Sequence, residues 1–272
     1  MRHPILIIFF VALIQQARSQ STSTLIGGRA AGMAYASATL QDEWSIYNNV
    51  AGLASVKQTI ITSTVDVKPK LQGANRSAFA LTVPTSLGTI GAGAFRFGDE
   101  LYYEQLVNVG FSNQLGIASL GASMNYIQYN AQGFGTIHLL TFSAGGIANL
   151  SKSVSIGASI HNINQPVLSE VDGEKVPTRL SFGLGITPTE KVRLCTELSK
   201  EVDQLATFKT GIEYKATKKF YGRTGFSLYP NHFFAGIGFA QSRLSIDYAY
   251  QYAFTGLGDS HQASLGYKWK GK

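Results

Sequence analysis

Apolar residues alternate with small or polar residues, with a period of two, from Thr59 to the end of this chain of 272 residues. In one such segment Leu244 and Ile246 share one face, while Ser245 and Asp247 share the other. About fourteen segments of roughly 8–11 residues follow the pattern, which is the length that a tilted membrane strand requires. Because two residues is the period of a strand and not of a helix, we expect an all-β fold. The pattern predicts an antiparallel transmembrane β-barrel of about 14 strands or, as the alternative, a soluble β-sandwich.

The expected strands can be placed along the chain. Their centres are predicted near Ser63, Leu81, Gly91, Val109, Ala122, Phe142, Ala158, Phe182, Leu194, Gly211, Gly225, Gly236, Ile246 and Gly266. Short turns are expected near 85–87, 115–116, 151–153, 188–190, 217–218 and 241–242, and longer loops at 68–75, 97–103, 129–136, 164–178, 200–205 and 253–261. Short turns on one side and longer loops on the other are typical of membrane barrels.

Composition favours the barrel over the sandwich. Charged residues make up 14% of the chain, against roughly 25% in soluble domains. The polar faces of the strands are rich in Gly, Ser and Ala, which suits a crowded interior better than a solvated surface. Tyr250, Tyr252, Tyr267 and Trp269 are candidates for the aromatic girdles at the membrane interfaces.

The N-terminus reads as a secretory signal peptide. Arg2 and His3 form a basic region, residues 5–14 an apolar one, and Ala17 and Ser19 supply small residues at the cleavage site. The apolar run is too short for the roughly twenty residues of a membrane-spanning helix. We therefore predict a cleaved signal peptide over 1–19 and export to the outer membrane of a Gram-negative cell.

Between this signal and the first strand lies a segment with a different pattern. The stretch WSIYNNVAGLAS, residues 44–55, looks like a short amphipathic helix closed by a turn. We expect residues 20–57 to form a plug inside a barrel built from 58–272; a cap outside the barrel is the alternative.

Aromatic side chains of this plug could pack on the inner wall, its asparagines could satisfy polar groups in the turn, and Gly52 could permit a tight approach to the first strand. The candidates for plugging and gating are Trp44, Tyr47, Asn48, Asn49, Val50 and Gly52.

Charged residues on the polar faces of the C-terminal strands predict a ladder of ion pairs in the lumen. Turn positions place Arg193 opposite Glu213, Glu197 opposite Lys209, Arg223 opposite Glu213, and Asp247 opposite Lys268. An interior joined by ion pairs would not be an open aqueous pore.

The chain shows no arrangement typical of an enzyme or of a cofactor site. Asp259, Ser260 and His261 are adjacent in a loop, which cannot place them in the geometry of a catalytic triad. The five histidines are isolated, so no metal site is expected. The net charge of +7 is spread without a basic block, which argues against nucleic acid as a partner. We predict a non-enzymatic protein without cofactors.

Several motifs resemble those of the FadL-like outer-membrane β-barrel proteins, and most closely the PorV/PorQ branch of Bacteroidetes type. The matching segments are GGRAAGM (27–33), NVAGLA (49–54), IHNINQP (160–166), VPTRLSFGLGI (176–186), LSIDYAYQY (244–252) and GDSHQASLGYKW (258–269). The resemblance implies a barrel of about fourteen strands with an N-terminal plug inside it. Where this family commonly has Asn-Pro-Ala-Gly-Leu, the chain has Val50 in place of the proline, which removes a rigid constraint on the turn.

Two functions follow from this resemblance. The first is a binding or scaffolding barrel associated with type IX protein secretion, with secretion components or cargo as partners. The alternative is a FadL-like channel for hydrophobic compounds such as long-chain fatty acids. Such a channel needs a continuous apolar path in the lumen, and the sequence shows none, which favours the scaffold. Outer-membrane lipid is expected as a partner in either case.

Overall fold

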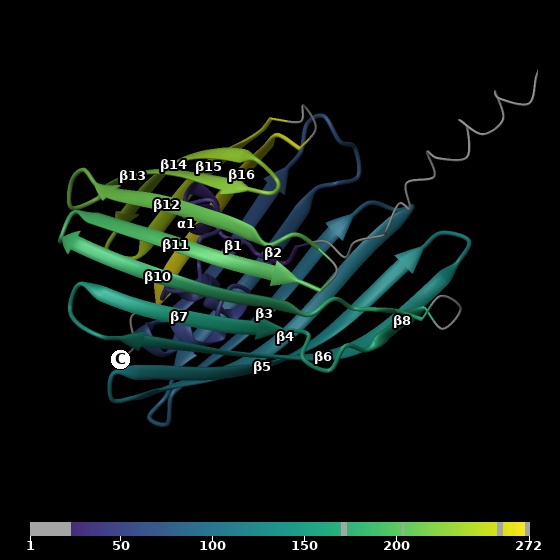
Figure 1. Cartoon of the computed structure of the whole chain (residues 1–272), viewed down its shortest axis with the longest axis horizontal. Coiled ribbons are helices and arrows are strands. Elements are labelled where there is room, and N and C mark those ends of the chain that lie inside the picture. The colour runs from purple at the N-terminus through teal and green to yellow at the C-terminus, as the bar shows by residue number, and fades with distance from the viewer. Residues whose placement is uncertain (1–22, 170–172, 203, 255–257, 270–272) are drawn as a thin grey trace, which may run out of the picture.

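The computed structural model describes residues 23–169, 173–202, 204–254 and 258–269 of the chain. Fourteen antiparallel strands close into one barrel, in which each strand pairs with its sequence neighbours among the barrel strands and β1 pairs with β16 (Figure 1). Every predicted strand centre falls within one of these strands. The prediction of a 14-stranded antiparallel barrel is therefore confirmed.

The strands of the barrel wall run almost the whole length of the chain. They are β1 (Thr59–Val67), β2 (Arg76–Pro84), β3 (Thr89–Gly98), β4 (Tyr102–Leu115), β5 (Ala118–Ala131), β6 (Gly135–Asn149), β7 (Val154–His161), β10 (Arg179–Thr189), β11 (Val192–Glu201), β12 (Thr207–Lys215), β13 (Phe220–Leu228), β14 (His232–Gln241), β15 (Leu244–Ala253) and β16 (Ser260–Trp269). A separate two-stranded sheet, β8 (Val167–Ser169) with β9 (Glu174–Lys175), lies in the connection between β7 and β10.

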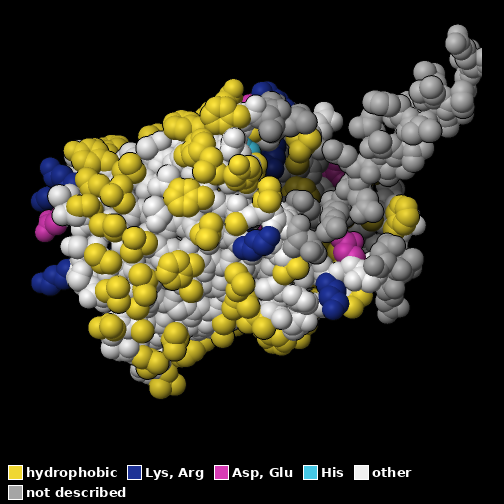
Figure 2. Space-filling view, viewed as in Figure 1, with side chains coloured by type: hydrophobic (Ala, Val, Ile, Leu, Met, Phe, Trp, Pro, Cys, Tyr) yellow, Lys and Arg dark blue, Asp and Glu magenta, His cyan; other side chains and the backbone are white. Residues whose placement is uncertain are grey.

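The alternation seen in the sequence separates the two faces of the wall. In β1, Thr62, Thr64 and Asp66 are buried toward the lumen, whereas Ile61 and Val65 are exposed on the outside. Apolar side chains are spread over the outer wall, and the Lys and Arg side chains are few and scattered among them and at both ends (Figure 2). An apolar outer face around a polar, filled interior is the arrangement of a barrel that stands in a membrane.

The connections at the two ends of the barrel differ, but less than predicted. The loops expected at 97–103 and 129–136 are tight, because β3 to β6 continue into them and leave only 99–101 and 132–134 outside the strands. The longest connection is the one that contains β8 and β9. We call the end with the turns between β2 and β3, β4 and β5, and β6 and β7 the short-turn end, and the opposite end the long-loop end.

The N-terminal segment lies inside the barrel (Figure 1). It contains a short α-helix, α1 (Gly28–Gly32), and two 3₁₀ helices, η2 (Glu43–Ile46) and η3 (Val50–Ser55). The segment begins at the long-loop end, where Arg76 donates hydrogen bonds to the carbonyl oxygens of Ser23 and Leu25. It then fills the lumen on its way to the start of β1. The predicted signal peptide 1–19 lies outside the described residues.

Among the described residues, none of these helices is long or apolar enough to cross a membrane.

Candidate functional site

The plug fits the barrel because the wall carries glycine where the plug backbone comes closest. A Cβ atom added at Gly211 would lie 2.6 Å from the carbonyl oxygen of Met33, and one at Gly225 would lie 2.6 Å from the backbone nitrogen of Ala34. At Gly121, on the opposite side of the barrel, an added Cβ would lie 2.9 Å from the Val50 backbone. The Gly-rich inner faces of the strands are therefore the surface against which the plug packs.

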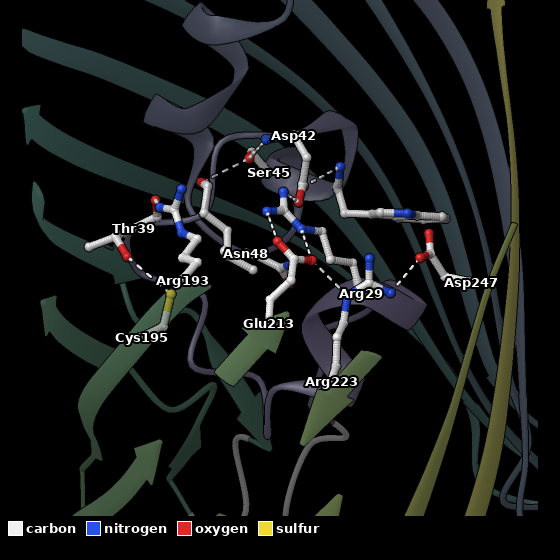
Figure 3. A network of polar contacts seen from close by, with 12 residues as sticks. Arg29, Thr39, Asp42, Ser45, Asn48, Arg193, Cys195, Glu213, Arg223 and Asp247 are labelled. Carbon is white, nitrogen blue, oxygen red and sulfur yellow. Dashed lines mark hydrogen bonds and ion pairs between the residues drawn. The ribbon is translucent and has the colours of Figure 1, made fainter. Parts of the chain in front are cut away.

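Arg29 in α1 joins the plug to the wall through a network of charges (Figure 3). Its Nε and Nη2 donate to the two carboxylate oxygens of Glu213 at 3.0 and 2.7 Å, and its Nη1 lies 3.3 Å from Asp42. Arg223 donates to the same Glu213 at 2.7 Å and to Asp247 at 2.5 Å. Each buried charge in the network has a partner of opposite sign, which offsets the cost of burial.

A second set of polar contacts holds the next part of the plug. Glu197 accepts hydrogen bonds at 2.8 Å from the backbone nitrogens of Ser37 and Ala38, and Lys209 donates to it at 3.0 Å. Arg193 donates to the carbonyl oxygen of Thr39 at 2.7 Å (Figure 3). The predicted ladder residues therefore bind the plug as well as each other.

The register of the barrel agrees with most of the predicted ladder. Arg193 lies opposite Glu213, Glu197 opposite Lys209, and Arg223 opposite Glu213. Arg193 nevertheless donates to the plug, and the place beside Glu213 is taken by Arg29.

The pairing of Asp247 with Lys268 was predicted wrongly. Asp247 lies opposite Ser264, and Lys268 lies opposite Ile60 of β1. The error is a shift of four positions in the last hairpin, whose connection, 254–259, is not a tight turn that would fix the register. Asp247 still belongs to the luminal network, because Arg223 reaches it from β13.

Nearer the long-loop end than this network, a buried cluster anchors the first residues of the plug. Arg76 forms an ion pair with Asp66 and donates to the Tyr35 hydroxyl at 3.0 Å, and Tyr35 donates to Gln262 at 2.8 Å. Burial raises the pKa of Tyr35 to about 12, so the phenol stays neutral and can donate. This cluster could not be predicted from local sequence patterns, because its members come from the plug and from three different strands.

The two asparagines of the NNVAG turn organise the second half of the plug. Asn48 exchanges two hydrogen bonds with the backbone of Ile26, at 3.1 and 2.9 Å. Asn49 caps η3 by accepting from the Ala51 nitrogen at 3.2 Å and donates to the carbonyl oxygen of Ala38 at 2.7 Å. The turn thus ties three stretches of the plug together without the proline that the resembling family commonly carries there.

The remaining plug candidates lie in or beside the apolar side of the plug. Trp44, Tyr47 and Val50 are buried, and the Tyr47 hydroxyl donates to the carbonyl oxygen of Phe79 in β2 at 2.7 Å. Gly52 was predicted to permit a tight approach to the first strand, but its nearest neighbours are residues of the plug. A Cβ atom there would instead lie 2.5 Å from the carbonyl oxygen of Leu40, so this glycine permits the plug to fold on itself.

An apolar row, which was not predicted from the sequence, crosses the inner wall of five consecutive strands. Its members stand directly opposite one another from strand to strand: Ala78, Phe95, Leu106, Ile127 and Leu139. They pack in one cluster with Trp44, Ile46 and Tyr47 of the plug. The lumen therefore has an apolar side on β2–β6 and a charged side on β10–β16.

Two cavities lie between the plug and the long-loop end. The larger, of about 420 Å³, is lined by loop residues such as Leu71, Leu205 and Pro230. The smaller, of about 50 Å³, lies deeper, against Tyr47 of the plug and Phe95 of the apolar row. Both reach Ser23, Arg179 and Glu201, so they meet on that side of the lumen.

The described residues contain no group of three or more His, Cys, Asp or Glu side chains that could hold a metal ion. Asp259 accepts from Lys70 at 2.7 Å and His261 hydrogen-bonds the Tyr248 hydroxyl at 2.7 Å, so these neighbours do not act together.

The fold is shared with several solved hydrocarbon transporters and channels. The toluene transporter TbuX of Ralstonia pickettii superimposes with a TM-score of 0.70 and 12% identity, over 92% of this chain and 100% of the other. The CymD monoaromatic hydrocarbon channel gives 0.70 and 12%, over 92% and 98%. The toluene transporter TodX of Pseudomonas putida gives 0.65 and 12%, over 91% and 99%. At this identity the likeness establishes the fold.

No protein-family model matches the chain, and no curated protein matches it in sequence.

Proposed function

We propose that this protein is an outer-membrane channel that admits small hydrophobic compounds, with the N-terminal plug as its gate. The observation that carries the proposal is the apolar row on the inner wall of β2–β6, which meets the apolar side of the plug beneath the two cavities. An apolar surface inside a barrel lumen is unfavourable against water unless something apolar covers it. In this structure the plug side chains Trp44, Ile46 and Tyr47 cover it. When that half of the plug shifts, a hydrophobic solute entering from the long-loop end would cover it in their place.

The solved structures with this fold support a hydrophobic solute as the substrate class. TbuX and TodX are described as toluene transporters and CymD as a monoaromatic hydrocarbon channel. An apolar binding surface reached from one end of a plugged barrel suits a solute of that chemistry. This surface could not be traced in the sequence, and for that reason the sequence favoured the scaffold; the apolar row now favours the channel.

The plug fills the lumen toward the short-turn end, so passage requires part of it to move. The half that faces the apolar row is the better candidate for movement. It is held by the packing of Trp44, Tyr47 and Val50 and by hydrogen bonds between uncharged groups, such as Tyr47 with Phe79 and Ser112 with Ala51. In contrast, α1 is held by paired charges. Asn48, Asn49 and Gly52 bind other parts of the plug and would keep this half together as it shifts.

The test is uptake of radiolabelled toluene by cells that lack other hydrocarbon channels and express this chain. Phe97 packs at the edge of the apolar cluster, near the long-loop end and away from the plug network. Phe97→Gln is expected to reduce uptake several-fold, while Phe97→Leu keeps an apolar surface and should retain most of it. Equal uptake by both variants, or no uptake above cells without the protein, would contradict the proposal.

Localisation is tested in the same cells. We expect the protein in the outer-membrane fraction, with gel mobility that changes on heating, as is usual for membrane barrels. Recovery as a soluble periplasmic protein would exclude a channel.

A scaffold in type IX secretion remains the second candidate, and one observation favours it. The paired charges around Glu213 and Glu197 bind the plug firmly on one side, which suits a closed barrel that presents its surface to partners. Affinity isolation from native outer membrane with identification of the bound proteins separates the two candidates. Secretion components in the isolate, together with absent uptake, would favour the scaffold.

A further inference from the structure

Arg179, the first residue of β10, is a buried arginine whose charge is poorly compensated. It is 7% exposed and lies opposite His161 and Glu201 in the barrel register. Its Nη1 is 4.0 Å from Glu201, at the limit of an ion pair. Its Nε and Nη2 are buried and have no hydrogen-bond partner among the described residues.

These two nitrogens form the edge with which two other arginines of this lumen bind carboxylates. Arg29 uses Nε and Nη2 on the two oxygens of Glu213, at 3.0 and 2.7 Å. Arg76 uses the same two nitrogens on one oxygen of Asp66. The planar fork of Nε and Nη2 matches the two oxygens of a carboxylate, and such bidentate pairs are among the strongest polar contacts in proteins.

A guanidinium that is buried without partners is unfavourable, because it has lost its water and gained nothing in exchange. The other buried arginines described above avoid this cost through Glu213 and Asp66. A carboxylate brought by a ligand would do the same for Arg179.

The surroundings of Arg179 indicate what else that ligand carries. Arg179 lines the larger cavity, which is bounded by the long loops, and also the smaller, deeper one. The wall of the smaller cavity includes Tyr47, Phe95 and Tyr129, the aliphatic Leu106 and Ile127, and polar residues such as Glu104 and Asn108. Aromatic rings prefer to pack edge-to-face or offset against such aromatic side chains. At about 50 Å³ this cavity is smaller than the roughly 150 Å³ of an apolar cavity that binds benzene, so a ring would enter it only when the apolar half of the plug shifts.

We propose that Arg179 binds the carboxylate of a single-ring aromatic acid, whose ring lies on the apolar row of β3–β5. The inference rests on the proposed channel function and specifies its substrate class. A neutral hydrocarbon would cover the same apolar surface but would leave the Arg179 guanidinium unpaired.

The experiment is isothermal titration of the folded, detergent-solubilised protein with benzoate, toluene and acetate. Wild type should bind benzoate more tightly than either toluene, which lacks the carboxylate, or acetate, which lacks the ring. Arg179→Gln should weaken benzoate binding about tenfold or more and leave toluene binding unchanged. Arg179→Lys keeps the positive charge without the planar pair of donors, so its affinity for benzoate should lie between those of the wild type and Arg179→Gln.

Arg96→Gln is the matched control. Arg96 is exposed on the outer face of β3, with its Cζ 4.6 Å from the centroid of the Tyr103 ring. The same substitution there should not change benzoate binding. Glu201→Gln is the second variant, which keeps the inference testable if Arg179→Gln does not fold. Removing that negative charge should tighten benzoate binding, because the ligand carboxylate would no longer be repelled.

The outcomes are distinguishable. Benzoate binding that is unchanged in Arg179→Gln, weaker in Glu201→Gln, or no tighter in wild type than toluene or acetate binding overturns the aromatic-acid site. Toluene uptake would then still support a hydrocarbon channel. If neither benzoate nor toluene binds and toluene is not taken up, the channel function itself fails.

Discussion

The two sides of the lumen hold the plug by different means. On β10–β16 the contacts are ion pairs and hydrogen bonds between charged side chains, such as Arg29 with Glu213. On β2–β6 they are apolar packing and hydrogen bonds between uncharged groups, such as those from Tyr47 to the Phe79 carbonyl oxygen and from Ser112 to the Ala51 carbonyl oxygen. Charged contacts depend on exact geometry and fail abruptly, whereas apolar contacts can slide. The difference indicates a plug with a fixed side and a side that can yield to a hydrophobic solute.

The largest effect is expected from Glu213→Ala on the fixed side. The change leaves Arg29 with Asp42 alone and Arg223 with Asp247 alone, and breaking such a network costs about 3–5 kcal/mol. The free energy of unfolding can be measured from the fraction of unheated protein that keeps folded gel mobility in denaturant. Glu190→Gln, in the exposed turn before β11, is the control and should change nothing. A loss below about 1 kcal/mol for Glu213→Ala would show that the charged side does not hold the plug.

The next largest effect is expected from a larger side chain at the contact between wall and plug. Gly211→Val places side-chain atoms where the Met33 backbone lies, and overpacking of this kind costs about 1–3 kcal/mol. Gly222→Val is the matched control, because nothing lies within 4 Å of a Cβ atom added there. Limited proteolysis should cut the plug of Gly211→Val faster than that of Gly222→Val. Equal rates of cleavage would contradict the close fit of plug and wall.

A smaller effect is expected on the apolar side. Tyr47→Phe removes the 2.7 Å hydrogen bond to the Phe79 carbonyl oxygen but keeps the ring, for a loss of about 1 kcal/mol. Tyr214→Phe on the exposed outer wall is the control. If the apolar half of the plug is the moving part, Tyr47→Phe should also raise toluene uptake. Lower uptake at unchanged stability would place the gate elsewhere.

The sequence predicted the fold well because the barrel depends on a pattern that each strand carries by itself. It predicted Arg193 opposite Glu213 and Glu197 opposite Lys209 correctly in the hairpin of β11 and β12. It failed for Asp247, which lies opposite Ser264, four positions before Lys268. Both pairings cross loops of similar length, 202–206 and 254–259, and a loop of this length lets the register shift, so the register could not be predicted from the loop alone.

The luminal site was harder to predict for a related reason. The apolar row takes one large inward residue from each strand, for example Phe95 from β3 and Leu106 from β4, so no single strand shows it. Arg29 and Glu213 are 184 positions apart, and only the closed barrel with the plug inside brings them together. Features that depend on the register of many strands, or on the plug, could not be predicted from local patterns.

The acidic side of the plug predicts a pH dependence. Burial, and then the neighbouring Asp42, raise the pKa of Glu43 from its ordinary value of 4.5 to about 7. A raised pKa in the folded state means that this group favours folding below about pH 4.5 and loses that contribution as the pH rises through about 7. Melting of the wild type should therefore occur at lower temperature at pH 8 than at pH 5. Glu43→Gln should reduce this difference, and an unchanged difference would exclude Glu43 as its source.

The smallest effect is expected where the chain departs from the family that it resembles. Val50 is the first residue of η3, and Asn49 before it is extended, with φ −148° and ψ 103°. A proline is well suited to the first helical position, and an extended residue is what a following proline requires. Val50→Pro should therefore change the free energy of unfolding by no more than about 1 kcal/mol. Ala51→Pro is the control, because it removes the N–H that Asn49 caps at 3.2 Å and should be clearly more damaging. Equal damage from both would mean that the valine is needed for the plug, and that its side-chain packing, not the cap from Asn49, fixes the turn.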